Sequence, residues 1–173
     1  HVRSRRQRQM CIRDSIAAVL LGCVLGMLAG YFRAVDAVLM RVMDGIMAIP
    51  AVLLAITLVA MFGASLPTVI LAIAVPEIPR VTRLVRALVM SLRDEPFVEA
   101  ARALATPDAI ILWRDILPNS LAPLIVQGTF IAASAILTEA ILSFLGLGLP
   151  ADVPTWGNIM AEGRIQFCLL YTS

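Results

Sequence analysis

Two glutamates, Glu77 and Glu139, lie inside long apolar stretches of the sequence. A carboxylate is costly in hydrocarbon, so each must face protein or water and is a candidate for carrying a proton or contacting a polar substrate. Glu77 stands between Pro76 and Pro79, where we expect a break or bend in a helix. The structural alternative for Glu139 is hydrogen bonding to neighbouring Ser and Thr side chains within a helical bundle.

The sequence excludes several kinds of site. Because the single histidine is His1, the rest of the chain can form neither a histidine-containing catalytic triad nor a histidine metal site. The three cysteines, Cys11, Cys23 and Cys168, have no CxxC spacing that would indicate zinc or a disulfide framework. No GxxxxGK[ST] segment is present to cradle nucleotide phosphates. We therefore expect no catalytic residue, no metal and no cofactor.

The composition indicates a membrane protein. Hydrophobic residues make up 60% of the chain and charged residues 15%, with a mean hydropathy of +0.91. Soluble domains average roughly 45–50% apolar and about 25% charged residues. The arginines flank apolar runs and lack interleaved aromatic residues, so nucleic-acid binding is not expected. We predict an all-α, polytopic transmembrane helix bundle.

Uncharged runs of about 17–25 residues are long enough to span a bilayer. Pro50 is expected to kink the second predicted span, and Pro67 to begin the third after a turn at 63–67. Arginines after the third span mark the cytoplasmic side, and an external loop at 145–165 contains Trp156. The predicted spans are 16–32, 45–62, 67–90 and 119–142.

Both ends of the chain differ from the body. Residues 1–15 are polar and rich in arginine, and the sequence becomes apolar abruptly at Ile16. We interpret residues 1–15 and 168–173 as non-native tails. The alternative for residues 1–15 is a basic cytoplasmic arm.

Three glycines, Gly22, Gly26 and Gly30, recur every fourth residue in the first predicted span. Their spacing places them on one helix face, which allows a neighbouring helix to approach closely. We expect this face to pack within its own subunit; a dimer interface is the alternative.

Residues 93–118 form the predicted cytoplasmic loop. Two acids before Pro96 predict one helix start, and Thr106 is the predicted N-cap of a second helix that ends at Pro118. Each helix is too short to be stable without tertiary packing. The loop either caps its own bundle or docks a soluble partner. The first helix has an apolar stripe of Phe97, Ala100, Ala101 and Leu104.

These residues resemble a known family. Glu99-Ala100-Ala101, followed by Ile116-Leu117-Pro118, is similar to the EAA loop of permease subunits in ATP-binding-cassette (ABC) importers. Further segments resemble the dipeptide, oligopeptide and nickel branch of that family, and the resemblance covers roughly residues 16–167. These segments are GYF at 30–32, MRVMD at 40–44, TRLVR at 82–86, SFLGLG at 143–148 and TWGNIMAEGR at 155–164.

The resemblance implies that the loop couples a cytoplasmic ATPase to the spans. Glu99, Ala100 and Ala101, with Ile116, Leu117 and Pro118, would be coupling rather than catalytic residues. The family usually has glycine where this chain has Ala105. If the backbone needs a positive φ there, alanine costs on the order of 1 kcal/mol, so we expect the turn to be rebuilt around Pro107.

The resemblance also implies function and partners. The chain would be a non-enzymatic, multi-pass permease subunit in a bacterial or archaeal inner membrane, importing peptides or similar small solutes. Its partners would be ABC ATPase subunits, a second homologous permease, an extracytoplasmic solute-binding protein and membrane lipid. The resemblance implies six spans, of which this chain has four. The alternatives are a secondary transporter that uses Glu77 or Glu139 and a purely structural membrane subunit.

Overall fold

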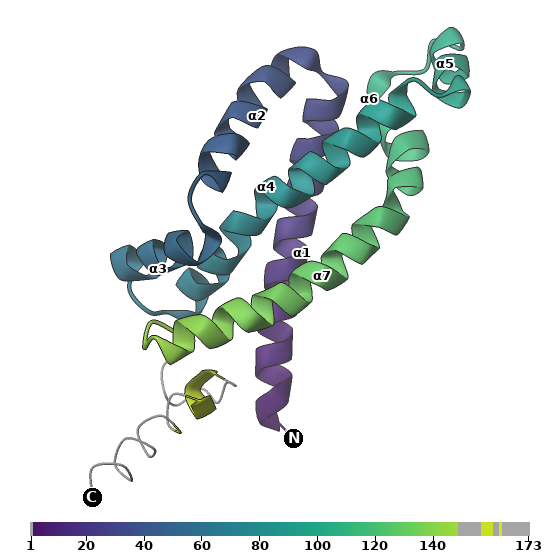
Figure 1. Cartoon of the computed structure of the whole chain (residues 1–173). Helices are drawn as coiled ribbons and strands as arrows, with labels where there is room; N and C mark the ends of the chain where they lie inside the picture. Colours follow the sequence, from purple (N-terminus) through teal and green to yellow (C-terminus); the bar gives the residue numbers. More distant parts are fainter. Residues whose placement is uncertain (1, 149–156, 161–162, 164–173) are drawn as a thin grey trace, which may run out of the picture. The chain divides into compact units, whose positions relative to one another are not determined.

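The computed structural model describes residues 2–148, 157–160 and 163; of residues 2–11, 13 and 14 it describes the backbone only. The regular structure of this part of the chain is helical, as predicted (Figure 1). Trp156 and residues 168–173 lie outside the described residues, and so does most of the predicted external loop at 145–165. The elements in order are α1 (Val2–Tyr31), α2 (Arg33–Met47), α3 (Ala51–Phe62), α4 (Leu66–Arg93), α5 (Pro96–Ala103), α6 (Asp108–Ile110), the π-helix η1 (Ile111–Ile116) and α7 (Leu117–Phe144).

The described residues contain one helical stretch, Asp108–Phe144, that is long and apolar enough to cross a membrane. The count rises to two if the bent pair α2 and α3 is a single span, and Ser15–Tyr31 is a shorter apolar helix. The number of spans therefore stays a prediction.

The chain divides into two compact units, and α1, α4 and α7 each contribute to both. The first unit takes its described residues from 1–17, 49–76 and 131–173. Its core joins α3, the start of α4 and the end of α7. The core residues are Ala55, Val59, Val69, Ala72, Ile73, Ala135 and Leu142.

The turn between α3 and α4 is built as predicted. Gly63 has a φ of 81°, which glycine adopts without steric cost. The Thr68 N–H donates to Ser65 Oγ at 3.4 Å, which satisfies one free amide at the start of α4. Pro67 lies in the first turn of that helix, where no intrahelical N–H is required.

The second unit comprises residues 18–48 and 77–130. Here the glycine face of α1 packs against α4, so the expectation of packing within the subunit is confirmed. A Cβ atom built on Gly26 would lie 2.6 Å from Val85 Cβ, and one on Gly30 would lie 2.6 Å from Val89 Cβ. Because Val85 and Val89 are fully buried, this contact is part of the core of the unit.

Two predicted helix boundaries were wrong. The charged segment before Gly45 belongs to α2, an amphipathic helix that buries Met43. The bend at Pro50 is not a kink within one helix, because α2 and α3 are separate helices at 85°. Pro50 lacks an N–H and restricts the residue before it, so it precedes α3 as the N-cap.

Prolines do not interrupt the long helices where the sequence predicts. The helix α4 continues through Pro76 and Pro79, because buried side chains on both sides of the prolines hold it. Pro118 does not end a helix but lies in the first turn of α7. The reason is η1, in which the Leu117 N–H donates to Leu112 O, five residues back. This wider turn makes room for the proline ring.

The helix α1 begins at Val2, so residues 2–15 continue the first helix in the structure rather than forming a separate segment. Whether these residues are native stays a prediction.

Candidate functional site

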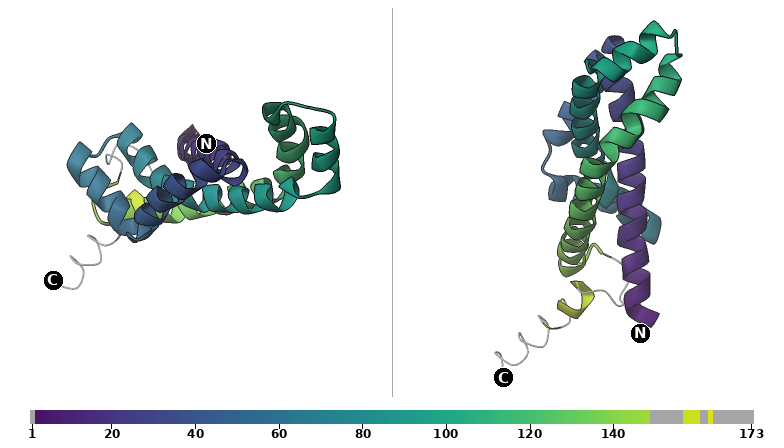
Figure 2. Two further views of the ribbon diagram at one scale, coloured as in Figure 1. Left: turned by 90° about the horizontal axis from the view of Figure 1, so that it is seen from above. Right: turned by 90° about the vertical axis from the view of Figure 1, so that its right-hand side faces the viewer.

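The predicted cytoplasmic loop connects α4 to α7 within the second unit (Figure 2). Pro96 is the first residue of α5, as predicted, and Glu95 is its extended N-cap. The Val98 N–H donates to Glu95 O at 3.0 Å, and the Glu99 N–H donates to the same oxygen at 3.2 Å.

Only Val98 of α5 is buried. The predicted apolar stripe points away from the protein, since Phe97 is 41% exposed and Leu104 is 81% exposed. Glu99, Ala100 and Ala103 are also exposed. Helical spacing places these five residues on one continuous arc, which we call the α5 face.

The α5 face is apolar with a single acid. The ion pairs of the described residues use Asp36, Asp44, Glu77 and Asp94, and Glu99 remains exposed. Two further apolar side chains are exposed just after α5: Ile110 at 45% and Trp113 at 61%. Exposed apolar side chains that gather in one place are typical of protein or membrane contact sites.

Ala105 keeps a left-handed backbone, with a φ of 56°. Its N–H donates to Arg102 O at 2.9 Å, and the Thr106 N–H donates to Ala101 O at 3.1 Å. This pair of bonds is a Schellman motif, which ordinarily has glycine at the left-handed position. The expected rebuilding of the turn was therefore wrong. Thr106 is also not an N-cap, because its N–H closes α5 and Pro107 precedes α6.

Replacing Ala105 with glycine should relieve this strain and slow hydrogen exchange at the Thr106 amide about fivefold, equivalent to about 1 kcal/mol. Ala103→Gly is the matched control. Glycine at this position destabilises the helix α5, so hydrogen exchange at the Thr106 amide should become faster by a similar factor. Mass-spectrometric hydrogen exchange on the detergent-solubilised protein measures both. Faster exchange in Ala105→Gly would contradict the left-handed backbone.

The predicted coupling residues Ile116, Leu117 and Pro118 differ in their exposure. Ile116 is fully buried together with Ile111, so these two residues anchor the loop. Leu117 is half-buried, whereas Pro118 is exposed. Among the sequence-predicted residues, Glu99, Ala100, Ala105 and Pro118 are therefore accessible to a partner and Ile116 is not.

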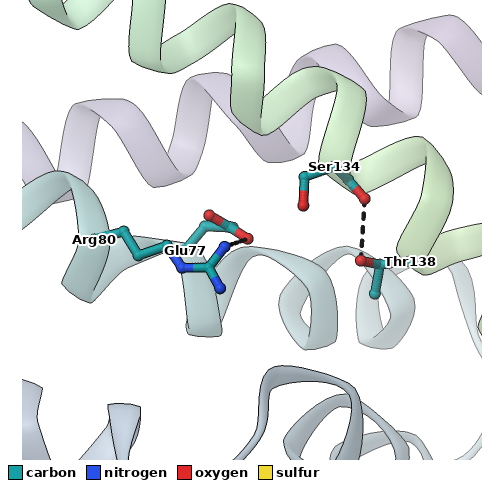
Figure 3. A network of polar contacts seen from close by, with 4 residues as sticks. All are labelled: Glu77, Arg80, Ser134 and Thr138. Carbon is teal, nitrogen blue, oxygen red and sulfur yellow. Dashed lines mark hydrogen bonds and ion pairs between the residues drawn. The ribbon is translucent and has the colours of Figure 1, made fainter.

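The two acids that the sequence predicts to be intramembrane belong to different units. Glu77 is 5% exposed and accepts a hydrogen bond from Arg80 Nη1 at 2.9 Å (Figure 3). Its Oε2 atom has no hydrogen-bond partner among the described residues. Glu139 is 2% exposed and accepts a hydrogen bond from Ser143 Oγ at 2.7 Å, as its structural alternative expects. On the same helix Thr138 Oγ1 donates to Ser134 O at 3.0 Å (Figure 3).

Sequence reasoning missed the contacts that tie the loop and α2 to the rest of the second unit. Arg83 forms an ion pair with Asp44. Arg86 donates two hydrogen bonds to Asp36, one from Nε to Oδ1 and one from Nη2 to Oδ2 at 2.6 Å. These bonds hold the pKa of Asp36 below its ordinary value. Tyr31 contacts both ends of the Ala105 turn. No spacing within one segment could have indicated pairs so distant in sequence.

Across the described ranges, no group of three or more His, Cys, Asp or Glu side chains could hold a metal ion. The described residues thus place an exposed apolar face on α5 and two buried acids, Glu77 and Glu139, elsewhere.

Known proteins match most of this chain. A family model described as "Binding-protein-dependent transport system inner membrane component" matches residues 18–172. A Sinorhizobium fredii protein named "Probable peptide ABC transporter permease protein y4tQ" is 51% identical over 79% of this chain and 47% of its own length. The dipeptide transport system permease protein DppC of Alkalihalophilus pseudofirmus is 45% identical over 85% of this chain and 49% of its own.

A glutathione transport system permease protein, GsiD of Pectobacterium atrosepticum, is 38% identical over 86% of this chain and 50% of its own. The chain thus spans about half the length of the curated relatives it matches. These relatives are named as permease proteins of transport systems, not as enzymes. The chain belongs to the family of binding-protein-dependent transport system inner-membrane components, in the branch of peptide ABC transporter permeases.

Proposed function

We propose that this chain forms part of the translocation path of an ATP-driven importer for dipeptides, oligopeptides or similar small solutes. Its α5 face docks on a separate ABC ATPase subunit. A second homologous permease and an extracytoplasmic solute-binding protein complete the importer, and the chain crosses the membrane several times.

The exposure of the α5 face is the observation that carries the proposal. A helix whose one buried residue is Val98 leaves Phe97 and Leu104 open to solvent, an arrangement that becomes favourable when a partner covers them. Ala100 and Ala103 let that partner approach the backbone closely, and Glu99 can pair with a basic side chain or a helix N-terminus.

The expected position of the α5 loop on the cytoplasmic side of the membrane also supports the proposal. Arg80, Arg83, Arg86 and Arg93 lie in α4 directly before the loop, and basic residues favour the cytoplasmic side. A cytoplasmic position is the one in which α5 meets an ATPase. The chain itself has no phosphate-binding GxxxxGK[ST] segment, so hydrolysis is assigned to that separate subunit.

Uptake driven by ATP alone is the expected behaviour of the importer. In proteoliposomes that contain the permease carrying this sequence, its ATPase and its binding protein, a labelled dipeptide should accumulate with internal ATP and without a proton gradient. The family favours this mechanism over a secondary transporter in which Glu77 or Glu139 carries protons.

Glu77→Gln and Glu139→Gln serve as the discriminating variants. Each should leave the requirement for ATP unchanged, because the energy enters at α5. Uptake driven by an imposed proton gradient without ATP, and lost in either variant, would overturn the proposal.

A further inference from the structure

Tyr31, the last residue of α1, contacts the predicted cytoplasmic loop (residues 93–118) at two points. Tyr31 Oη donates a hydrogen bond to Asp108 Oδ1. The guanidinium carbon of Arg102 lies 5.5 Å from the centre of the Tyr31 ring, within the range of a cation–π contact. The neighbouring Phe32 ring meets the Tyr31 ring edge to face, with centroids 5.3 Å apart.

The two contacts lie on opposite sides of the strained turn. Arg102 is in the last turn of α5, and Asp108 begins α6. Between them lies Ala105 with its left-handed backbone. A strained residue persists only where its surroundings determine its conformation, and Tyr31 supplies that constraint from outside the loop.

The loop needs such a constraint because α5 has only eight residues, too few for a helix that is stable by itself. Tyr31, by contrast, extends from a helix that is firmly held. Gly30, the residue before it, packs against the fully buried Val89 of α4. A single side chain therefore joins the packed pair of α1 and α4 to both halves of the loop.

We propose that Tyr31 is the positioning residue that fixes the orientation of α5 and carries displacement of α5 to α1. The proposal rests on the proposed docking of an ATPase at α5. Tyr31 contacts Asp108 and Arg102, which lie outside the α5 face, so it acts through these two residues.

Tyr31→Phe tests the hydroxyl while keeping the ring and its contact with Arg102. In the assembled importer, uptake per ATP hydrolysed should fall about tenfold, the effect of losing one hydrogen bond to a charged group. Capture of the ATPase should be unchanged. Phe32→Leu, which alters the adjacent ring but not the bond to Asp108, should retain normal uptake per ATP.

Asp108 provides the conservative comparison. Asp108→Asn keeps an oxygen that accepts the Tyr31 hydrogen bond and should retain most of the uptake, whereas Asp108→Ala should match Tyr31→Phe. The double variant Tyr31→Phe with Asp108→Ala should be no worse than either single variant, because both remove one interaction. Losses that multiply would overturn action through Asp108.

A distance measurement separates this proposal from the proposed function. Spin labels at exposed Leu28 on α1 and exposed Ala103 on α5 should give a narrow distance distribution in the permease alone, and Tyr31→Phe should broaden it. An equally narrow distribution in Tyr31→Phe would overturn the positioning role. Failure of the permease to capture any ATPase would instead overturn the proposed docking, while the distances still test Tyr31.

Discussion

Exchange of Glu99 for arginine is expected to abolish capture of the ABC ATPase by the permease carrying this sequence. Glu99 is exposed on α5 and is the one acid of the α5 face. Reversal of its charge places a cation where a basic partner or a helix N-terminus would dock, and like charges in an interface cost several kcal/mol, on the order of a hundredfold or more in affinity. Co-purification from membranes measures the effect.

Asp94→Arg is the matched control. It makes the same charge change in the same loop, but Asp94 lies before α5 and is 74% exposed beside Arg93. Capture should persist in this variant. Equal loss in both variants would mean that net charge of the loop, rather than the α5 face, determines docking.

Gly26→Leu is expected to separate α1 from α4 and lower the free energy of unfolding by about 3 kcal/mol. A Cβ at Gly26 would already lie 2.6 Å from Val85 Cβ and 2.7 Å from Thr82 O. Thr82 O belongs to the backbone of α4, and the Val85 side chain is fully buried, so neither group can move out of the way. Unfolding in mixed detergent micelles, followed by circular dichroism, measures the loss.

Gly45→Ala is the control, in which the free energy of unfolding should rise instead of fall. Gly45 lies in α2, and a Cβ atom added there would have no heavy atom of another residue within 4 Å beyond its own helical turn. Alanine should therefore stabilise the helix by about 1 kcal/mol. If Gly26→Leu were as stable as the unmodified protein, the close contact between α1 and α4 would be wrong.

Local sequence patterns predicted the features that depend on neighbouring residues. Pro96 after two acids predicted the start of α5, and Gly63 with Pro67 predicted the turn into α4. The four-residue spacing of the α1 glycines predicted a close helix contact, which α4 supplies. Each signal is a backbone preference or a helix periodicity, and both can be read from one segment.

Tertiary packing decided the features that local patterns predicted incorrectly. Proline in a helix costs about 3 kcal/mol, yet α4 continues through Pro76 and Pro79 because the adjoining turns are buried. Pro118 lies in the first turn of α7, directly after the wider turn of η1. The charges of α2 suggested a break between spans, but Asp36 and Asp44 are paired with arginines of α4. The alanine at position 105 retains the left-handed turn because Tyr31 and the Schellman bonds hold it.

The orientation of α5 could not be predicted from the sequence. The spacing of Phe97 and Leu104 correctly placed them on one helix face, but an apolar stripe of this kind usually faces a core. The structure turns it outward and buries Val98 instead. Which face a short amphipathic helix buries depends on its anchors, here Ile111 and Ile116, and these lie in a different element.

Site-specific photo-cross-linking reports which surface of this chain touches the ATPase. A photoreactive residue at Ala100, on the α5 face, should form an adduct with the ATPase subunit in membranes. The same residue at Ala64, an exposed alanine in the turn between α3 and α4, should form none. Adducts from Ala64 but not from Ala100 would contradict the assignment of α5 as the coupling surface.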